Sequence, residues 1–219
     1  MTIRALIFDL DGVIVDTARY HYIAWREIAR ELGFRFTEKE NERLKGVSRM
    51  QSLDILLQVG GLQLTQHEKE QLAEKKNAHY LTYIERMTAG EVLPGVLPFL
   101  AEAKEMKLRV ALGSASKNAP LILEKTMLSP FFDCIVDGND VNAAKPDPEV
   151  FLKAAQLLEV KPEECLVFED AEAGVEAARR AGMWCVGIGS PQVLSAANLV
   201  IPGFSGFSVR DILEKFNSK

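Results

Sequence analysis

Near-continuous apolar runs rich in Ile, Val and Leu alternate with amphipathic stretches of helical length along most of this chain. Strands that are buried on both faces have this composition, and strands that alternate with helices form βαβ units around a parallel sheet. The sequence thus predicts an α/β fold with a Rossmann-like parallel sheet core flanked by helices. We predict strands at residues 3–8, 108–112, 134–136, 166–168, 184–188 and 199–201, and helices at residues 96–106, 119–128, 148–158 and 171–181.

One interval breaks the alternation of strands and helices. From about residue 17 to residue 87 the pattern is helical and contains no convincing strand. We expect residues 16–91 to form an inserted helical cap domain, and residues 1–15 and 92–219 to form the Rossmann-like catalytic core. Two short connections would join the cap to the core, an arrangement that commonly serves as a hinge.

The composition excludes several classes of function. The chain has a formal net charge of −5 and no long basic run, so we expect no nucleic-acid partner. Its three cysteines are isolated in apolar segments, which argues against a disulfide framework or a zinc site. No stretch approaches the roughly 20 apolar residues of a membrane span, and the first residues lack a secretory signal pattern. We expect a cytoplasmic protein without a membrane partner, and a monomer, since cap and core can bury each other's surfaces.

Polar and charged residues gather at the ends of the predicted strands. Ligands of open parallel sheets bind outside the carboxyl ends of the strands, so the loops that follow are candidate binding sites. Because these loops lie far apart in sequence but at one edge of the sheet, we expect them to meet in one crevice. They are residues 9–12, 113–118, 145–148 and 169–170.

The side chains in these loops have a coherent chemistry. Four carboxylates would repel one another and raise each other's pKa unless a cation neutralised them, and oxygen ligands suit Mg²⁺. Ser114 can donate a hydrogen bond to a phosphoryl oxygen, and Lys145 supplies a compact positive charge. The predicted ligand is a phosphoryl group beside Mg²⁺. The four carboxylates belong to Asp9, Asp11, Glu169 and Asp170.

Asp9 and Asp11 are separated by one residue, so alternation at a strand end would place both side chains on the same side. One aspartate can act as a nucleophile and form an aspartyl-phosphate, while the second carboxyl transfers a proton. Simpler interpretations exist, since Asp-Gly pairs are common in turns and acidic residues favour helix N-termini. Glu169 and Asp170 could therefore serve a helix start, a metal, or both.

Four motifs in order give the chain a specific resemblance. They are the Asp-Leu-Asp-Gly-Val segment at residues 9–13, the loop of Ser114, the Lys-Pro pair at residues 145–146 and the Glu-Asp pair at residues 169–170. In this order they resemble the haloacid dehalogenase-like phosphotransferase superfamily. Within it the sequence is most similar to the beta-phosphoglucomutase family, which also has a helical cap after the first motif. The resemblance covers essentially the whole chain.

The resemblance implies roles for the core residues. Asp9 would be the nucleophile and Asp11 the general acid and base. The Mg²⁺ ligands would be the Asp9 carboxylate, the Asp11 main-chain carbonyl and the Asp170 carboxylate, with Glu169 close by. Ser114 and Lys145 would bind the transferring phosphoryl group, Ala115 and Asn118 would complete the loop of Ser114, and Ser116 of the same loop would also bind phosphate or substrate.

The resemblance also implies a substrate-binding surface on the cap and its linker. Without the resemblance these residues have ordinary interpretations. His21 would be a surface or interface histidine, Trp25 would pack in an apolar core, and Lys76 would lie on a solvated helix face. The cap assignments therefore depend on the resemblance more than the core assignments do. The implied residues are Thr17, His21, Trp25, Lys45, Gly46, Val47, Ser48, Arg49, Ser52 and Lys76.

The implied function is an isomerase that moves phosphate between C1 and C6 of β-glucose, with a small sugar phosphate as its partner. Such a reaction passes through a bisphosphate and needs a second phosphate site, which Arg49 could provide. Closure of the cap would exclude water and favour transfer to the sugar. Two alternatives stay open: a Mg²⁺-dependent phosphatase of the same fold that cleaves a sugar phosphate or phosphoglycolate, and a catalytically idle phosphate-binding module.

Overall fold

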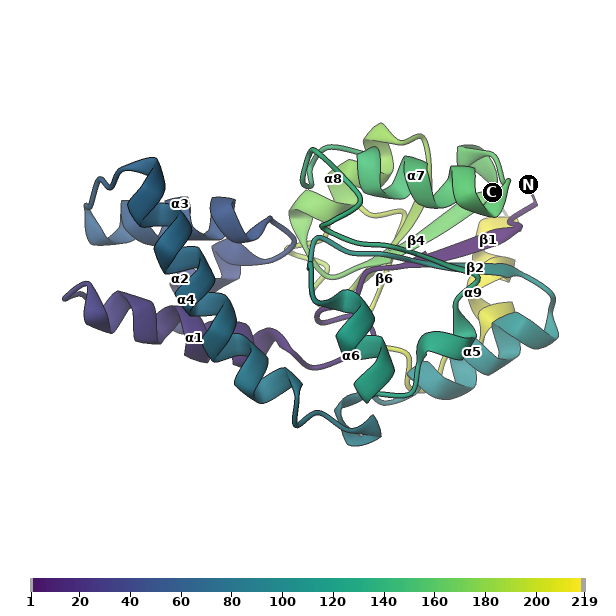
Figure 1. Cartoon of the computed structure of the whole chain (residues 1–219). Helices are drawn as coiled ribbons and strands as arrows, with labels where there is room; N and C mark the ends of the chain where they lie inside the picture. The colour runs from purple at the N-terminus through teal and green to yellow at the C-terminus, as the bar shows by residue number, and fades with distance from the viewer. Residues whose placement is uncertain (1, 218–219) are drawn as a thin grey trace.

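The computed structural model describes residues 2–217 and contains a six-stranded parallel sheet with the order β3-β2-β1-β4-β5-β6 (Figure 1). Strand β1 lies near the middle, and the chain crosses it between β3 and β4, so the topological switch point lies beside β1. The predicted α/β fold is confirmed. The strands are β1 (Ala5–Phe8), β2 (Arg109–Gly113), β3 (Cys134–Val136), β4 (Cys165–Glu169), β5 (Trp184–Ile188) and β6 (Leu199–Ile201).

Helices cover both faces of the sheet (Figure 1). Leu6 and Phe8 of β1 pack on one side, whereas Ala5 and Ile7 pack on the other, and all four are fully buried. This two-sided burial explains why the strand has a continuous apolar run. One face carries α7 (Glu149–Leu158) and α8 (Glu172–Arg180), and the other carries α5 (Val96–Glu105), α6 (Ala119–Lys125) and α9 (Val209–Asn217).

Four phenylalanines form the centre of the core on the side of α5. Phe8 and Phe168, on neighbouring strands, stack with their ring centroids 4.7 Å apart. Phe99 of α5 packs edge-on against Phe168 with centroids 5.4 Å apart, and Phe204 lies 4.9 Å from Phe99. Phe8 and Phe168 directly precede Asp9 and Glu169, so this packing fixes the strand ends that carry acidic side chains.

Most ends of the predicted core elements lie within two residues of those observed, but two helices differ more. The helix predicted at residues 119–128 ends at Lys125, because Met127 adopts a left-handed conformation with a φ of 60°. Methionine is not a usual helix terminator, so no local signal marked this end. Helix α9 was not predicted, and its apolar side packs on the sheet core through Ile212 and Phe216.

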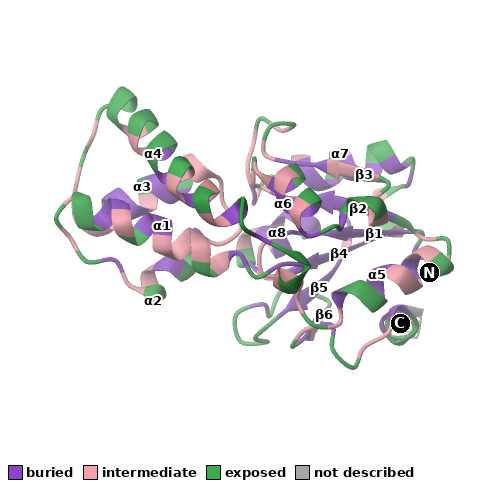
Figure 2. Cartoon of the chain, turned by 60° about the horizontal axis from the view of Figure 1, so that its bottom comes forward, coloured by how far each residue is buried: buried purple, intermediate pink, exposed green. Residues whose placement is uncertain are grey.

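The predicted helical insert between β1 and β2 is also confirmed, and it forms a separate lobe (Figures 1 and 2). It has its own apolar core, which includes Trp25, Ile28 and Leu53. Within the described part of the chain, no helix is both long enough and apolar enough to cross a bilayer. The insert contains α1 (Ala18–Glu31), α2 (Glu38–Asn41), α3 (Arg49–Gly60) and α4 (Gln66–Ile84). Short 3₁₀ helices occur at η1 (Glu42–Leu44), η2 (Ala89–Glu91), η3 (Ser129–Phe131) and η4 (Pro162–Glu164).

The two connections between insert and core run side by side. Val15 and Val92 form an antiparallel bridge, and the Asp16 N–H donates a 3.0 Å hydrogen bond to the Glu91 carbonyl. We therefore keep, as a proposal, the domain boundaries between residues 15 and 16 and between residues 91 and 92. Two adjacent connections of this kind commonly serve as a hinge.

The phenylalanine packing predicts a large loss of stability on truncation. Phe99→Ala should lower the free energy of unfolding by about 3–5 kcal/mol, because a buried ring is replaced by a cavity. The matched control is Leu97→Ala on the same helix, where the side chain is 42% exposed and the change should stay within about 0.5 kcal/mol. Urea unfolding followed by circular dichroism measures both. Equal losses in the two variants would contradict the proposed importance of the aromatic packing.

Candidate active site

The carboxyl ends of the central strands open into a cavity of about 610 Å³, whose walls come from both the core and the helical insert. Asp9 directly follows β1, and Ser114 directly follows β2. Glu169 is the last residue of β4, and Lys145 lies in the loop between β3 and α7. The four loops that are distant in sequence therefore meet at one place.

Lys145 links two of these strand ends. Its Nζ atom lies 2.6 Å from Asp9 Oδ1 and 2.7 Å from Glu169 Oε1, and its side chain has no exposed surface. Burial opposes the charge, but the two carboxylates outweigh that effect and raise the pKa of Lys145. The ammonium therefore stays charged. It also lies 4.7 Å from the ring centroid of Phe151, so an aromatic face completes its surroundings.

Two glycines make room for the acidic side chains. Gly12 has a φ of +80°, and a Cβ atom there would lie 2.3 Å from Asp170 Oδ2. A Cβ atom on Gly174 of α8 would lie 1.7 Å from Glu169 Oε1. Glu169 Oε2 also accepts a 3.0 Å hydrogen bond from the Ala171 N–H, so this carboxylate serves the start of α8 as well as Lys145. A side chain at either glycine would displace a carboxylate.

Asp9, Glu169 and Asp170 form a candidate metal site, in which one carboxylate oxygen from each lies within 4.8 Å of the others. Burial raises the pKa of Asp9 to about 7, with Lys145 opposing it and Glu169 adding to it. Burial and the Glu169 charge also raise the pKa of Asp170 well above its usual range. Excess buried negative charge on oxygen ligands is what a hard divalent cation neutralises, so the donor set fits Mg²⁺.

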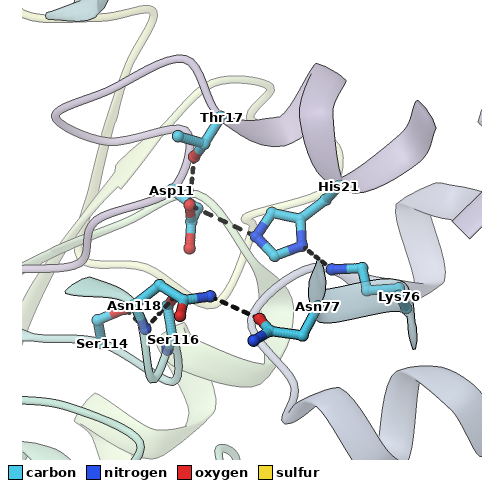
Figure 3. A network of polar contacts seen from close by, with 8 residues as sticks. All are labelled: Asp11, Thr17, His21, Lys76, Asn77, Ser114, Ser116 and Asn118. Carbon is cyan, nitrogen blue, oxygen red and sulfur yellow. Dashed lines mark hydrogen bonds and ion pairs between the residues drawn. The ribbon is translucent and has the colours of Figure 1, made fainter. Parts of the chain in front are cut away.

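The carboxylate of Asp11 is held from the side of the insert (Figure 3). The Thr17 hydroxyl donates a hydrogen bond to Asp11 Oδ1, and His21 Nε2 lies 3.7 Å from the same oxygen. His21 Nδ1 lies 2.8 Å from Lys76 Nζ. Burial and the Lys76 charge lower the pKa of His21 well below its usual range, so the ring is neutral. With Nδ1 accepting from Lys76, the ring proton lies on Nε2 and faces Asp11.

Lys76 is buried among aromatic rings. Its Nζ atom lies 4.5 Å from the ring centroid of Tyr80 and 4.9 Å from that of Trp25. The His21 ring packs on Tyr80 with centroids 4.1 Å apart. Burial, together with the nearby charge of Arg49, lowers the pKa of Lys76 to about 7. Two cationic side chains, Lys76 and Arg49, therefore lie close together on the cap side of the cavity.

The loop before α3 brings the insert against the core. Lys45 Nζ lies 3.9 Å from Asp170 Oδ2, and a Cβ atom on Gly46 would lie 2.8 Å from the Ala171 side chain. Ser48 is the N-cap of α3, with its hydroxyl accepting a hydrogen bond from the Gln51 N–H. Ser48 thus has a structural role in addition to lining the cavity, and it places Arg49 at the first helical position.

Most predicted site residues line the cavity. Thr17 and Glu169 do not; they lie behind its wall, where they bond to Asp11 and Lys145. The Asp11 carboxylate is not part of the acidic cluster. The predicted residues that line the cavity are Asp9, Asp11, His21, Trp25, Lys45, Gly46, Val47, Ser48, Arg49, Ser52, Lys76, Ser114, Ala115, Ser116, Asn118, Lys145 and Asp170.

The sequence analysis missed several neighbours of the site. Asn41 and Lys117 line the cavity, and Tyr80 supports His21 and Lys76 from behind. Lys117 lies inside a predicted loop and could have been chosen with its neighbours. Asn41 and Tyr80 carried no local signal, because only the packing of the helices brings them to the cavity.

Comparison with known proteins agrees with this architecture. The model of the haloacid dehalogenase-like hydrolase family matches residues 3–182. The chain is 41% identical over 215 residues to beta-phosphoglucomutase of Bacillus subtilis (strain 168), covering 97% of this chain and 95% of that protein. It is 35% identical over 182 residues to a phosphorylated carbohydrates phosphatase of Thermotoga maritima, covering 82% of each.

A solved structure is equally similar. The crystal structure of beta-phosphoglucomutase from Clostridium difficile superposes with a TM-score of 0.95 at 42% identity, covering 99% of this chain and 98% of that one. The resemblance inferred from the four motifs is therefore confirmed. The chain belongs to the haloacid dehalogenase-like hydrolase family.

Proposed function

We propose that this enzyme interconverts β-D-glucose 1-phosphate and glucose 6-phosphate through an aspartyl-phosphate on Asp9 and a glucose 1,6-bisphosphate intermediate. The observation that carries the proposal is a cavity lined by cationic side chains from two walls, Lys145 from the core and Arg49 from the cap, each of which can bind a phosphate. A bisphosphate needs two such groups. Similarity to the beta-phosphoglucomutase of Bacillus subtilis over nearly the whole chain supports it.

The core wall suits the transferring phosphoryl group. Asp9 provides the nucleophilic carboxylate, and Lys145 keeps one of its oxygens oriented through a 2.6 Å hydrogen bond. Ser114 follows β2 and is 1% exposed, so its hydroxyl can donate to a phosphoryl oxygen with little competition from water. Together these groups bind and orient the phosphoryl group for in-line transfer.

The acidic cluster suits Mg²⁺ as the cofactor. Asp9, Asp170 and the main-chain carbonyl of Asp11 would hold the ion, and Glu169 would support the site through Lys145. Bound there, Mg²⁺ would neutralise charge on the carboxylates and on the phosphoryl oxygens. The requirement follows from the excess of buried carboxylates over nearby cations.

Asp11 would move the proton in each half-reaction. The Thr17 hydroxyl and His21 Nε2 both face Oδ1 of Asp11. Oδ2 is therefore left to accept the proton from the attacking sugar hydroxyl. Burial raises the pKa of Asp11, so the carboxyl can keep this proton and return it to the next leaving oxygen. The phosphoryl group first passes from Asp9 to the sugar, and the other phosphate then returns to Asp9.

The cap wall suits the phosphate that is not being transferred. Arg49 lines the cavity and makes no hydrogen bond or ion pair with other residues in the described part of the chain. Lys76 lies near enough for the positive charge of Arg49 to contribute to its lowered pKa. A phosphate dianion bound between core and cap would relieve this repulsion and hold the cap closed. After the bisphosphate reorients, either of its phosphates can occupy the cap wall.

A phosphatase of the same fold is the second candidate. It would use the same Asp9 and Asp11 chemistry, with water as the final acceptor in place of a sugar hydroxyl. The observation that favours it is the 35% identity to a Thermotoga maritima protein named as a phosphorylated carbohydrates phosphatase. The two candidates differ in the acceptor, so the products distinguish them.

Product analysis tests the proposal directly. The protein is incubated with Mg²⁺, β-glucose 1-phosphate and a trace of glucose 1,6-bisphosphate, and glucose 6-phosphate and inorganic phosphate are measured together. We expect glucose 6-phosphate to be the main product, and Asp9→Asn to form neither product because the nucleophile is lost. Inorganic phosphate as the main product would move the enzyme to the phosphatases.

A substitution on the cap tests the second phosphate site. Arg49→Ala should reduce kcat/KM for β-glucose 1-phosphate by about 100-fold or more, because a charged hydrogen-bonding partner of the remote phosphate is lost. Hydrolysis of p-nitrophenyl phosphate, which has no second phosphate, should fall much less. Arg43→Ala is the matched control, since this exposed cap arginine contacts Gln58 and does not line the cavity. Equal losses on both substrates would contradict a remote phosphate site.

The affinity for Mg²⁺ should depend on pH. The raised pKa of Asp9, about 7, means that a proton must leave before the carboxylate can bind the ion. The apparent Kd for Mg²⁺ should therefore be roughly tenfold higher at pH 6 than at pH 8, as measured by calorimetric titration. Asp170→Asn should weaken binding at both values, whereas Asp54→Asn on the exposed cap surface should not. An affinity independent of pH would contradict the protonated Asp9.

A further inference from the structure

Asn77 of α4 joins the cap to the core through a hydrogen bond between two neutral amides. Its Oδ1 atom accepts a 2.9 Å hydrogen bond from Nδ2 of Asn118, in the loop that follows β2 (Figure 3). Asn118 lines the cavity, but Asn77 does not. Asn77 can therefore act on a bound ligand through Asn118 rather than by touching it.

From Asn118 the contacts continue to the strand end. The Asn118 N–H donates a 3.3 Å hydrogen bond to the Ser116 hydroxyl, and the Ser116 N–H donates a 3.1 Å hydrogen bond to the Ser114 hydroxyl (Figure 3). Each of these bonds spans two residues and fixes the turn of the loop. A cap residue is thus connected, through three hydrogen bonds, to the hydroxyl that we assign to the transferring phosphoryl group.

Neighbouring residues of α4 contact different parts of the site. Lys76 reaches His21 on the side of Asp11, whereas Asn77 reaches the loop after β2. Consecutive side chains on a helix point about 100° apart. Lys76 and Asn77 can therefore make both contacts at once only when α4 is held in one rotation about its axis. The position of α4 therefore affects the loop after β2 as well as the surroundings of Asp11.

The strength of the Asn77–Asn118 hydrogen bond suits a contact that must form and break in every turnover. A neutral hydrogen bond contributes little net free energy, because water satisfies both amides when they separate. An ion pair buried at this place would instead hold the cap closed against release of product. Both asparagines are half-buried, so water can reach them when the cap moves.

We propose that Asn77 is a positioning residue that couples closure of the cap to the geometry of the loop at residues 114–118. This inference rests on the proposed function, because it assigns the loop to the transferring phosphoryl group. The Asn77–Asn118 hydrogen bond forms only when the cap is closed and shields the cavity from water. The loop is therefore fully ordered only in that closed state. The coupling therefore favours transfer to the sugar over transfer to water.

The coupling predicts a specific kinetic pattern for Asn77→Ala. The closed state becomes less populated, so kcat/KM for β-glucose 1-phosphate should fall by about three- to tenfold. The loss should appear mainly as a higher KM, because saturating substrate, which contacts both walls, closes the cap again. Glu74→Ala, an exposed position on the same helix, is the matched control and should keep the wild-type values.

A double-mutant cycle tests whether Asn77 acts through Asn118. Asn77→Ala, Asn118→Ala and the double variant are compared for kcat/KM, and circular dichroism checks that each is folded. In the Asn118→Ala background, removing the Asn77 side chain should have no further effect. An equal loss in both backgrounds, or no loss in the wild-type background, would overturn the proposal.

Hydrogen exchange gives a readout that does not depend on the reaction. In Asn77→Ala, the amides of Ser116 and Asn118 should exchange faster, because their hydrogen bonds lie in the loop that Asn77 positions. Unchanged exchange there would also overturn the proposal.

If the wild-type protein releases only inorganic phosphate, the proposed mutase function is wrong. The double-mutant cycle is then measured by kcat/KM for phosphate release. Failure of the proposed function and failure of the Asn77 coupling are thus distinguishable.

Discussion

The hydrogen bonds from Lys145 to Asp9 and Glu169 are the interaction on which the rest of the site depends. They place one cation between two carboxylates where none of the three side chains is appreciably exposed to water. Buried charges are tolerated only when they are paired and hydrogen-bonded. The pairing also joins the ends of β1 and β4, so it holds the two acidic strand ends together beside the switch point of the sheet.

The residues around the acidic cluster make room for its carboxylates and hold them in place. Gly12 and Gly174 leave space for the carboxylates of Asp170 and Glu169, and any larger residue would meet them. The aromatic packing of Phe8 and Phe168 fixes the backbone directly before the acidic residues. The core end of the cavity is therefore rigid and rich in carboxylates, and it suits a divalent cation and a phosphoryl group. The cap adds the cationic side chains of Arg49 and Lys76 to the cavity and contacts the core through a hydrogen bond between two neutral amides, Asn77 and Asn118.

The continuous apolar runs allowed the sheet to be predicted, because a strand covered by helices on both faces is apolar at nearly every position. The core site could be predicted for a related reason, since unusual polar residues at the carboxyl ends of parallel strands are brought together by the topology. The prediction was less accurate where the signal was not local. Met127 ends α6 in a left-handed conformation that its residue type does not indicate, and α9 became visible only through its packing on the sheet.

The sequence by itself determined the α/β core, the helical insert and the acidic strand-end loops, because periodicity and residue type are local properties that survive in a linear pattern. Only the tertiary structure decided which residues of the insert face the core. Helix α4 carries polar residues around much of its surface, so the sequence does not distinguish Lys76 and Asn77 from solvated neighbours such as Lys75. The packing of α4 against α1 and beside α6 buries Lys76, brings Asn77 to Asn118 and places Tyr80 beneath His21.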